Sequence, residues 1–174
     1  MADDELLSVE LVTPERVLVV GTASQVILRT ADGDITFLPG HTPLVGAVVP
    51  CVVRVVGAGE SDGAELRAAV HGGFVQVGQD APPDPGESGV PRRTRVTLLA
   101  GVAELAGEID TERARVALDA ATARVAELGT AGRGAPAVSG EEPEEDRELA
   151  EAEAALRRAE VRLEAAGVAA GATS

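Results

Sequence analysis

The period at which apolar residues recur changes near residue 109, and this change constrains the fold more than any other feature of the chain. Before it, Val and Leu recur in short runs separated by turn signals such as Gly21 and Gly78. After it, apolar residues recur every three or four positions. A period of two is typical of strands, and a period near 3.6 is typical of helices. The sequence therefore predicts an N-terminal antiparallel β-sandwich or barrel over 1–105 and a C-terminal antiparallel two-helix hairpin over 106–168.

Alternation within the first part predicts which side chains are buried. It is clearest at residues 94–98, where Val96 and Leu98 fall on one face of a strand. Arg54 lies inside the apolar run 52–56 and is expected to point outward between buried neighbours. With two Phe and no Tyr or Trp, the core must be built from Val, Leu, Ile and Ala. Cys51 is expected to be an inert core thiol, because it begins an apolar run.

The second part predicts two helices whose apolar residues form stripes. The first stripe has spacings of 4, 3, 4 and 3, and it comprises Ala114, Leu118, Ala121, Val125 and Leu128. Gly129 is expected to end this helix. In the second helix leucine alternates with alanine at steps of 3 and 4, in the series Leu149, Ala152, Leu156, Ala159, Leu163 and Ala166. Its acidic residues lie near the start and three arginines near the end, which suits the helix dipole.

The loop around residues 33–44 is the most distinctive local feature. Asp32-Gly33 favours a tight hairpin turn, and Pro39-Gly40 suits the central positions of a type II turn. His41 and Thr42 should then be presented at a rigid tip, before Pro43 and the apolar run that Leu44 begins. The residues alone leave two interpretations open, a contact surface or an ordinary constrained loop between strands.

Charge and composition exclude several classes of function. Acidic residues outnumber basic ones 29 to 15, which argues against binding to nucleic acid or to an anionic membrane surface. No apolar run approaches the roughly 20 residues that span a bilayer, and the acidic N-terminus lacks signal-peptide features. The two histidines, His41 and His71, lie in turn-like contexts, without a nucleophile elbow or phosphate loop. We therefore expect no catalytic residue and no metal site, and a cytoplasmic location.

Three motifs, in this order, give the chain a recognisable family resemblance. Gly33 followed by Pro39-Gly40-His41-Thr42-Pro43-Leu44 resembles a loop signature of the ε subunit of bacterial F-type ATP synthases. Val70-His71-Gly72-Gly73-Phe74-Val75 resembles a glycine-pair strand of that family, and Ile109–Ala114 resembles the motif that opens its helical hairpin. The resemblance runs from about Leu6 to Ala166. The composition also resembles that of actinobacterial members.

This resemblance implies a non-catalytic central-stalk (rotor) subunit of a proton-translocating enzyme. It implies that the sandwich binds the γ subunit and the c-ring, with Gly33 and residues 39–44 as subunit contacts. It also implies that the hairpin can reach the α/β catalytic hexamer and inhibit ATP hydrolysis. The chain would then be a peripheral protein, held by the complex at the cytoplasmic face of the bacterial cell membrane.

The resemblance also implies a regulatory ATP site, although no cofactor is required. Some ε subunits bind ATP through residues that correspond here to Glu104, Asp110 and Arg113, and Arg124 is the nearest match to a further arginine. Asp110 and Arg113 are three apart, so they share a helix face. The structural alternative is that Asp110 caps the helix and pairs with Arg113.

Three segments are expected to lie outside the packed units. They are the Pro-rich loop 80–93, the acidic linker 129–148 and a disordered tail, 169–174. The loop and the linker look like insertions relative to shorter family members. Two alternatives to a rotor subunit share the same architecture, an unrelated adaptor protein and a stand-alone nucleotide sensor. The three ordered motifs argue against the adaptor, and the sensor would have to bind ATP without a stable partner.

Overall fold

The structure divides into two compact units at the position where the sequence period changes. The computed structural model describes residues 6–57, 64–80, 93–131 and 144–168. The units are Met1–Glu108 and Ile109–Ser174, so the first ends three residues later than expected. A short 3-10 helix, η2 (Ala106–Glu108), closes the first unit. Arg16, in the turn between the first two strands, forms an ion pair with Glu108 and ties η2 to that unit.

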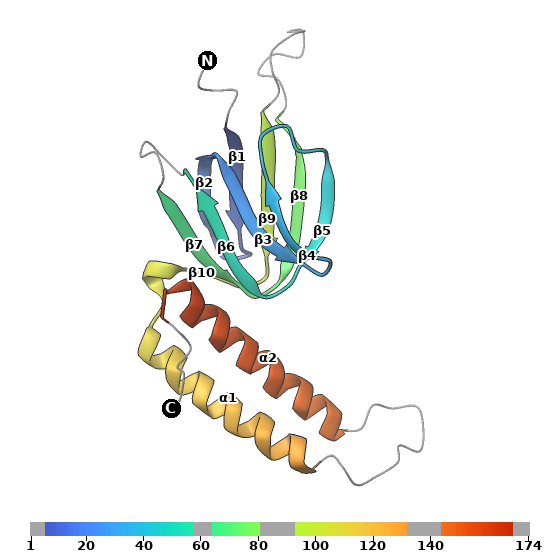
Figure 1. Ribbon diagram of the computed structural model, residues 1–174, viewed down its shortest axis with the longest axis vertical. Helices are drawn as coiled ribbons and strands as arrows, with labels where there is room; N and C mark the ends of the chain where they lie inside the picture. The colour runs from blue at the N-terminus through green and yellow to red at the C-terminus, as the bar shows by residue number, and fades with distance from the viewer. Residues whose placement is uncertain (1–5, 58–63, 81–92, 132–143, 169–174) are drawn as a thin grey trace, which may run out of the picture. The chain divides into compact units, whose positions relative to one another are not determined.

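The first unit is built from strands (Figure 1). They are β1 (Leu7–Val12), β2 (Val17–Ala23), β3 (Gln25–Thr30), β4 (Gly33–Phe37), β5 (Leu44–Val48), β6 (Cys51–Val56), β7 (Glu65–Val70), β8 (Gly73–Gln79), β9 (Thr94–Ala100) and β10 (Ala103–Leu105). Their order across the sheet is β10-β7-β6-β3-β5-β8-β9-β1-β2, with β4 paired to β3. The predicted sandwich is confirmed, and it is mostly antiparallel. The exception is β1, which pairs parallel to β9 and so joins the start of the chain to its last long strand.

Two layers meet at a single point of pairing. β3 and β5 share only the pair Thr30–Val48, so the sheet bends there into a β3-β4-β6-β7-β10 layer and a β5-β8-β9-β1-β2 layer. Val9, Val53, Val75 and Val96 are each 2% exposed or less between the layers. Val96 and Leu98 share the buried face and Arg54 points outward, as predicted. Burying this many branched side chains is the main stabilising contribution of the sandwich.

The aliphatic core has one aromatic member that composition alone could not place. Phe37, at the end of β4, is fully buried, whereas the other phenylalanine, Phe74, is 60% exposed. Cys51 is a buried free thiol in the same core, as predicted. The first unit thus uses one of its two aromatic rings for packing and leaves the other at the surface.

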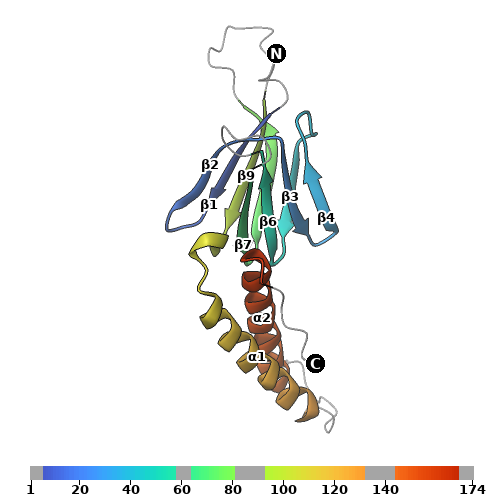
Figure 2. The same cartoon turned by 60° about the vertical axis from the view of Figure 1, so that its left-hand side comes forward.

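The second unit is a pair of packed antiparallel helices, α1 (Thr111–Ala131) and α2 (Glu144–Ala165), which Figure 2 shows side by side. Both predicted stripes are confirmed: Ala114 and Ala121 on α1 and Ala152 and Ala159 on α2 are buried. Alanine at these positions lets the helix axes approach closely.

The predicted end of α1 was wrong, and α2 ends in a glycine cap that was not predicted. α1 continues through Gly129 to Ala131, because an exposed glycine inside a helix costs only about 1 kcal/mol relative to alanine. α2 ends at a glycine: Gly167 has a φ of 74°, Val168 N donates to Leu163 O at 2.9 Å, and Gly167 N donates to Glu164 O at 3.0 Å. This is the hydrogen-bonding pattern of a Schellman cap.

The Pro-rich loop lies between Gln79, where β8 ends, and Thr94, where β9 begins, whereas the linker between the helices has other bounds than predicted. The linker 129–148 is shorter than expected, since α1 reaches Ala131 and α2 begins at Glu144, which leaves 132–143 between them. The backbone of Asp80 donates to Arg93 O at 2.9 Å and so closes the base of the Pro-rich loop. Residues 81–92, 132–143 and 169–174 lie outside the described residues.

Candidate subunit interface and predicted site residues

The Pro39-Gly40 turn has the geometry that the sequence predicts. Gly40 has a φ of 82°, in the left-handed region that position i+2 of a type II turn requires. His41 N donates to Leu38 O at 3.1 Å and closes the turn. Leu38 is 51% exposed, and Thr42 and Pro43 are also exposed. The turn therefore presents a rigid tip at the surface.

His41 is held by two contacts at this tip. Its ring forms a T-shaped contact with the ring of buried Phe37, with centroids 5.0 Å apart and planes at 78°. Its Nδ1 lies 2.8 Å from Thr42 O. Because a carbonyl oxygen only accepts hydrogen bonds, Nδ1 is the donor in this contact.

The remaining residues of the predicted contact set do not lie at the tip. Gly33 is the first residue of β4 and precedes Phe37 by four residues. In an extended strand this separates the two residues by about 13 Å. It follows the two-residue turn Ala31-Asp32, so the tight hairpin exists but is shifted by one residue from the expected Asp32-Gly33. Leu44 opens β5 and is half-buried against the core.

A continuous apolar row crosses the outer face of the β5-β8-β9-β1-β2 layer. The strand registers place one residue from each strand side by side, in the order Ala47, Phe74, Leu99, Val12 and Val17. Phe74, Leu99 and Val17 are 60%, 51% and 54% exposed. We call these five residues the apolar row. The sequence analysis did not predict this row, although Phe74 carries a signal, since it is an aromatic residue that alternates with buried Val75 and Val77.

The next row on the same face is mixed. Its members in strand order are Val45, Gln76, Thr97, Glu10 and Val20. The valines at its two ends are 73% and 74% exposed, so apolar side chains flank a polar centre. An apolar strip with a polar border is the pattern of a protein-protein interface, and an isolated monomer rarely exposes such a strip without a partner.

The outer face of the other layer has the opposite character. Arg54 donates to Glu65 at 2.6 Å, and Arg29 donates to Asp34 at 2.6 Å. These hydrogen bonds lower the pKa of the Glu65 carboxyl and the pKa of the Asp34 carboxyl, so both stay ionised near neutral pH. Cross-strand ion pairs of this kind suit contact with water, and the two outer faces are therefore not equivalent.

The four residues predicted for a nucleotide site have separate structural roles. Glu104 lies on β10 in the first unit and is half-buried. Asp110 caps α1, its Oδ1 accepting from the backbone N of Arg113 at 3.0 Å. The Arg113 side chain is exposed, and within the described ranges no carboxylate pairs with its guanidinium. The cap is therefore formed, but the expected Asp110–Arg113 ion pair is not.

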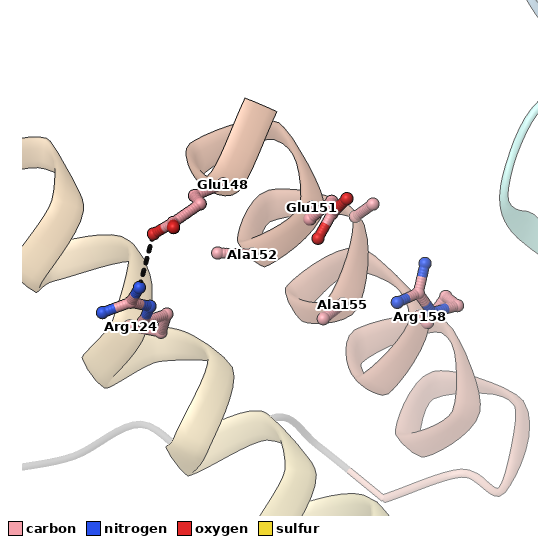
Figure 3. Close-up of a pocket in the computed structure, with 7 residues that line it drawn as sticks. Arg124, Glu148, Glu151, Ala152, Ala155 and Arg158 are labelled. Carbon is pink, nitrogen blue, oxygen red and sulfur yellow. Dashed lines mark hydrogen bonds and ion pairs between the residues drawn. The ribbon is translucent and has the colours of Figure 1, made fainter. Parts of the chain in front are cut away.

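Arg124 joins the two helices of the hairpin (Figure 3). Its guanidinium donates to Glu127 on α1 at 2.8 Å and to Glu148 on α2 at 2.6 Å. The hydrogen bond to Glu127 is the main cause that raises the pKa of Arg124. An open hollow of about 610 Å³ lies beside this bridge, with Glu151, Ala155 and Arg158 also on its lining. A bound phosphate group would have to compete with both carboxylates for Arg124.

No group of three or more His, Cys, Asp or Glu side chains in the described part of the chain is arranged to hold a metal ion. None of the described helices is both long and apolar enough to cross a membrane.

Comparison with known proteins assigns the family. Residues 6–81 match the model for "ATP synthase, Delta/Epsilon chain, beta-sandwich domain". The ATP synthase epsilon chain of Thermobifida fusca is 48% identical over 122 residues, which cover 70% of this chain and 78% of the relative. That of Moorella thermoacetica is 37% identical over 161 residues, which cover 92% and 96%.

A solved structure shares the fold. A chain in the Euglena gracilis mitochondrial ATP synthase aligns with a TM-score of 0.63 at 23% identity, over 93% of this chain and 81% of that one. At this identity the likeness speaks for the fold alone. The sequence relatives carry the assignment, since one of them is matched over nearly its whole length. The chain therefore belongs to the ATP synthase epsilon-chain family, the non-catalytic central-stalk subunits of F-type ATP synthases.

Proposed function

We propose that this chain couples the γ subunit to the c-ring of a proton-translocating ATP synthase. The outer face of β5-β8-β9-β1-β2 binds γ, and the tip at residues 39–43 faces the c-ring. The chain then lies at the cytoplasmic face of the bacterial cell membrane and is held there by the complex. The observation that carries this proposal is the apolar row, which has Phe74 near its centre and no covering element among the described strands of the first unit.

The chemistry of the two outer faces supports this choice of surface. Exposed aromatic and branched aliphatic side chains gain free energy when a partner removes them from water, at roughly 25 cal/mol per Å². The outer face with Arg54 and Arg29 already pairs its charges and would lose hydration without a comparable gain. A single partner surface on the β5-β8-β9-β1-β2 layer is therefore favoured.

The direct test is to mix the purified chain with its cognate α/β/γ core lacking this subunit and to follow both by size exclusion. We expect co-elution at micromolar concentrations. Separate elution would contradict the proposal and would leave a stand-alone adaptor or nucleotide sensor as the function.

We further propose that the hairpin regulates ATP hydrolysis. It forms a unit of its own, in which α1 and α2 bury their alanine and leucine stripes against each other. Extended toward γ and the α/β hexamer, the stripes would need new partners, so the hairpin is an element with two states. A ligand shifts such a balance only by binding one state more tightly than the other.

Removal of residues 109–174 is therefore expected to raise the ATPase activity of the reconstituted holoenzyme severalfold. The cut follows Glu108, so every strand and η2 remain. The control is Val116→Ala, which changes an exposed side chain and leaves the hairpin in place. Equal activity of the truncated and full-length enzymes would restrict the hairpin to a structural role.

Regulatory ATP is a second proposal, which involves Glu104, Asp110, Arg113 and Arg124. It is favoured by the Arg113 guanidinium, which is exposed and has no carboxylate partner within the described part of the chain. An arginine in this state can meet phosphate without first giving up an ion pair.

Isothermal titration calorimetry of the full chain with ATP tests this site. We expect a binding signal that Arg113→Ala abolishes. The matched control is Arg115→Ala, since Arg115 is exposed on α1 and already paired with Glu112. Absence of a signal in the unmodified chain would rule out the site.

A further inference from the structure

Thr94, at the start of β9, is the most deeply buried polar residue among those that the structure describes. It is 4% exposed and lies on the inward face of β9, together with Val96 and Leu98. A hydroxyl group in an apolar interior is costly unless it forms hydrogen bonds. The partner of this hydroxyl therefore shows what Thr94 contributes.

That partner is the backbone amide of Gly40. Gly40 N donates to Thr94 Oγ1 at 2.8 Å, across 54 residues of sequence. Gly40 occupies position i+2 of the type II turn, and the hydrogen bond that closes such a turn uses the amide at i+3, here His41. The Gly40 amide thus has no acceptor within its own turn, and Thr94 supplies one from a different strand.

Thr94 is itself held firmly. It pairs with Gln79 in the β8-β9 ladder, directly beside the hydrogen bond that Asp80 N donates to Arg93 O at 2.9 Å. The turn is fixed at its other end by the edge contact between His41 and the buried ring of Phe37. Two anchors, one polar and one aromatic, therefore fix how the tip projects from the sandwich.

We propose that Thr94 is a positioning residue for subunit contact. Its hydroxyl holds the Pro39–His41 tip in the geometry that the c-ring recognises. This rests on the proposed function, in which that tip contacts the complex. The physical gain is preorganisation, because a tip that is already ordered loses less conformational entropy on binding. Without the hydroxyl, the Gly40 amide loses its acceptor and the turn becomes free to sample other orientations.

The test compares Thr94→Val, which keeps the shape and removes the hydroxyl, with Thr94→Ser, which keeps the hydroxyl. Thr36→Val is the matched control, since Thr36 is an exposed threonine on β4, just ahead of the turn. If Thr94→Val yields too little folded protein, Thr94→Ala removes the same hydroxyl. Two properties of the full chain are measured: hydrogen exchange of the Gly40 amide by NMR, and affinity for the cognate ATP synthase that contains its c-ring and lacks only this subunit.

We expect Thr94→Val to speed exchange at Gly40 and to weaken binding, each by about five- to tenfold, the effect of losing one buried hydrogen bond. Exchange at the Val96 amide should stay slow, which separates a local effect from general loosening. Thr94→Ser and Thr36→Val should match the unmodified chain in both measurements.

Unchanged exchange at Gly40 in Thr94→Val would overturn the positioning role. So would faster exchange with unchanged affinity, because the tip would then not need this geometry for binding. These outcomes differ from a failure of the proposed function itself. In that case the unmodified chain would not bind the complex at all.

Discussion

Replacing Phe74 with alanine is expected to weaken binding of the chain to the γ-containing core by roughly 30-fold, the effect of losing an aromatic hot spot of about 2 kcal/mol. Phe74 is 60% exposed and lies between Ala47 and Leu99 in the apolar row. A partner that covers the row would bury this ring, and alanine would leave a gap at that place. Affinity should be measured by titrating the core lacking this subunit against labelled chain.

The control for this prediction is Val116→Ala, which removes an apolar side chain that is 67% exposed on α1. It should leave the affinity nearly unchanged. Thermal unfolding of Phe74→Ala should stay close to that of the unmodified chain, since the ring contributes little to the core. If Phe74→Ala binds as tightly as the unmodified chain, the apolar row is not the γ-binding surface.

Replacing Gly73 with alanine is expected to destabilise the sandwich by about 3 kcal/mol or more, at or above the upper end of the usual range for a single substitution. Gly73 has a φ of 147°, and a Cβ at this position would lie 2.1 Å from Leu99 O and 2.9 Å from Ala100 Cα. Both neighbours are backbone atoms of β9, which cannot rotate away. The β8-β9 pairing would have to open, and the melting temperature should fall by on the order of 10 °C or more.

Gly78→Ala is the matched control for this effect. It lies on the same strand, its Cβ would meet nothing within 4 Å, and its φ is outside the left-handed region. It should change stability by less than about 1 kcal/mol, in the stabilising direction if at all. A Gly73→Ala variant that melts like the Gly78→Ala variant would show that β8 and β9 adjust without cost.

Features that depend on neighbours in sequence were well predicted. The type II turn at Pro39-Gly40 follows from the preferred φ values of its two central residues, and the structure has it. The helix stripes follow from spacing, and the buried Ala121 and Ala152 agree with it. The exact ends were less reliable: Gly129 lies inside α1, because packing along the rest of the helix outweighs the weak preference of one residue.

In the candidate site, too, local features were predicted from the sequence, whereas contacts between distant residues were not. The sequence predicted His41 at a rigid tip, but it could not show that the Gly40 amide of that tip donates to Thr94, 54 residues further along the chain. It named Asp110 and Arg113 as a helix pair and left two roles open; in the structure Asp110 acts as a cap. The side-chain direction of Arg113 depends on local geometry that spacing alone does not specify.

By itself, the sequence determined the two-part architecture, the turn chemistry and the family resemblance, because each depends on residues close together along the chain. The tertiary structure decided the parallel pairing of β1 with β9, the burial of Thr94 and the apolar row. The apolar row takes one residue from each of five strands, with Val12 and Leu99 made neighbours by that parallel pair. Alternation within a strand shows that two faces exist, but only the register between strands decides which side chains meet on each face.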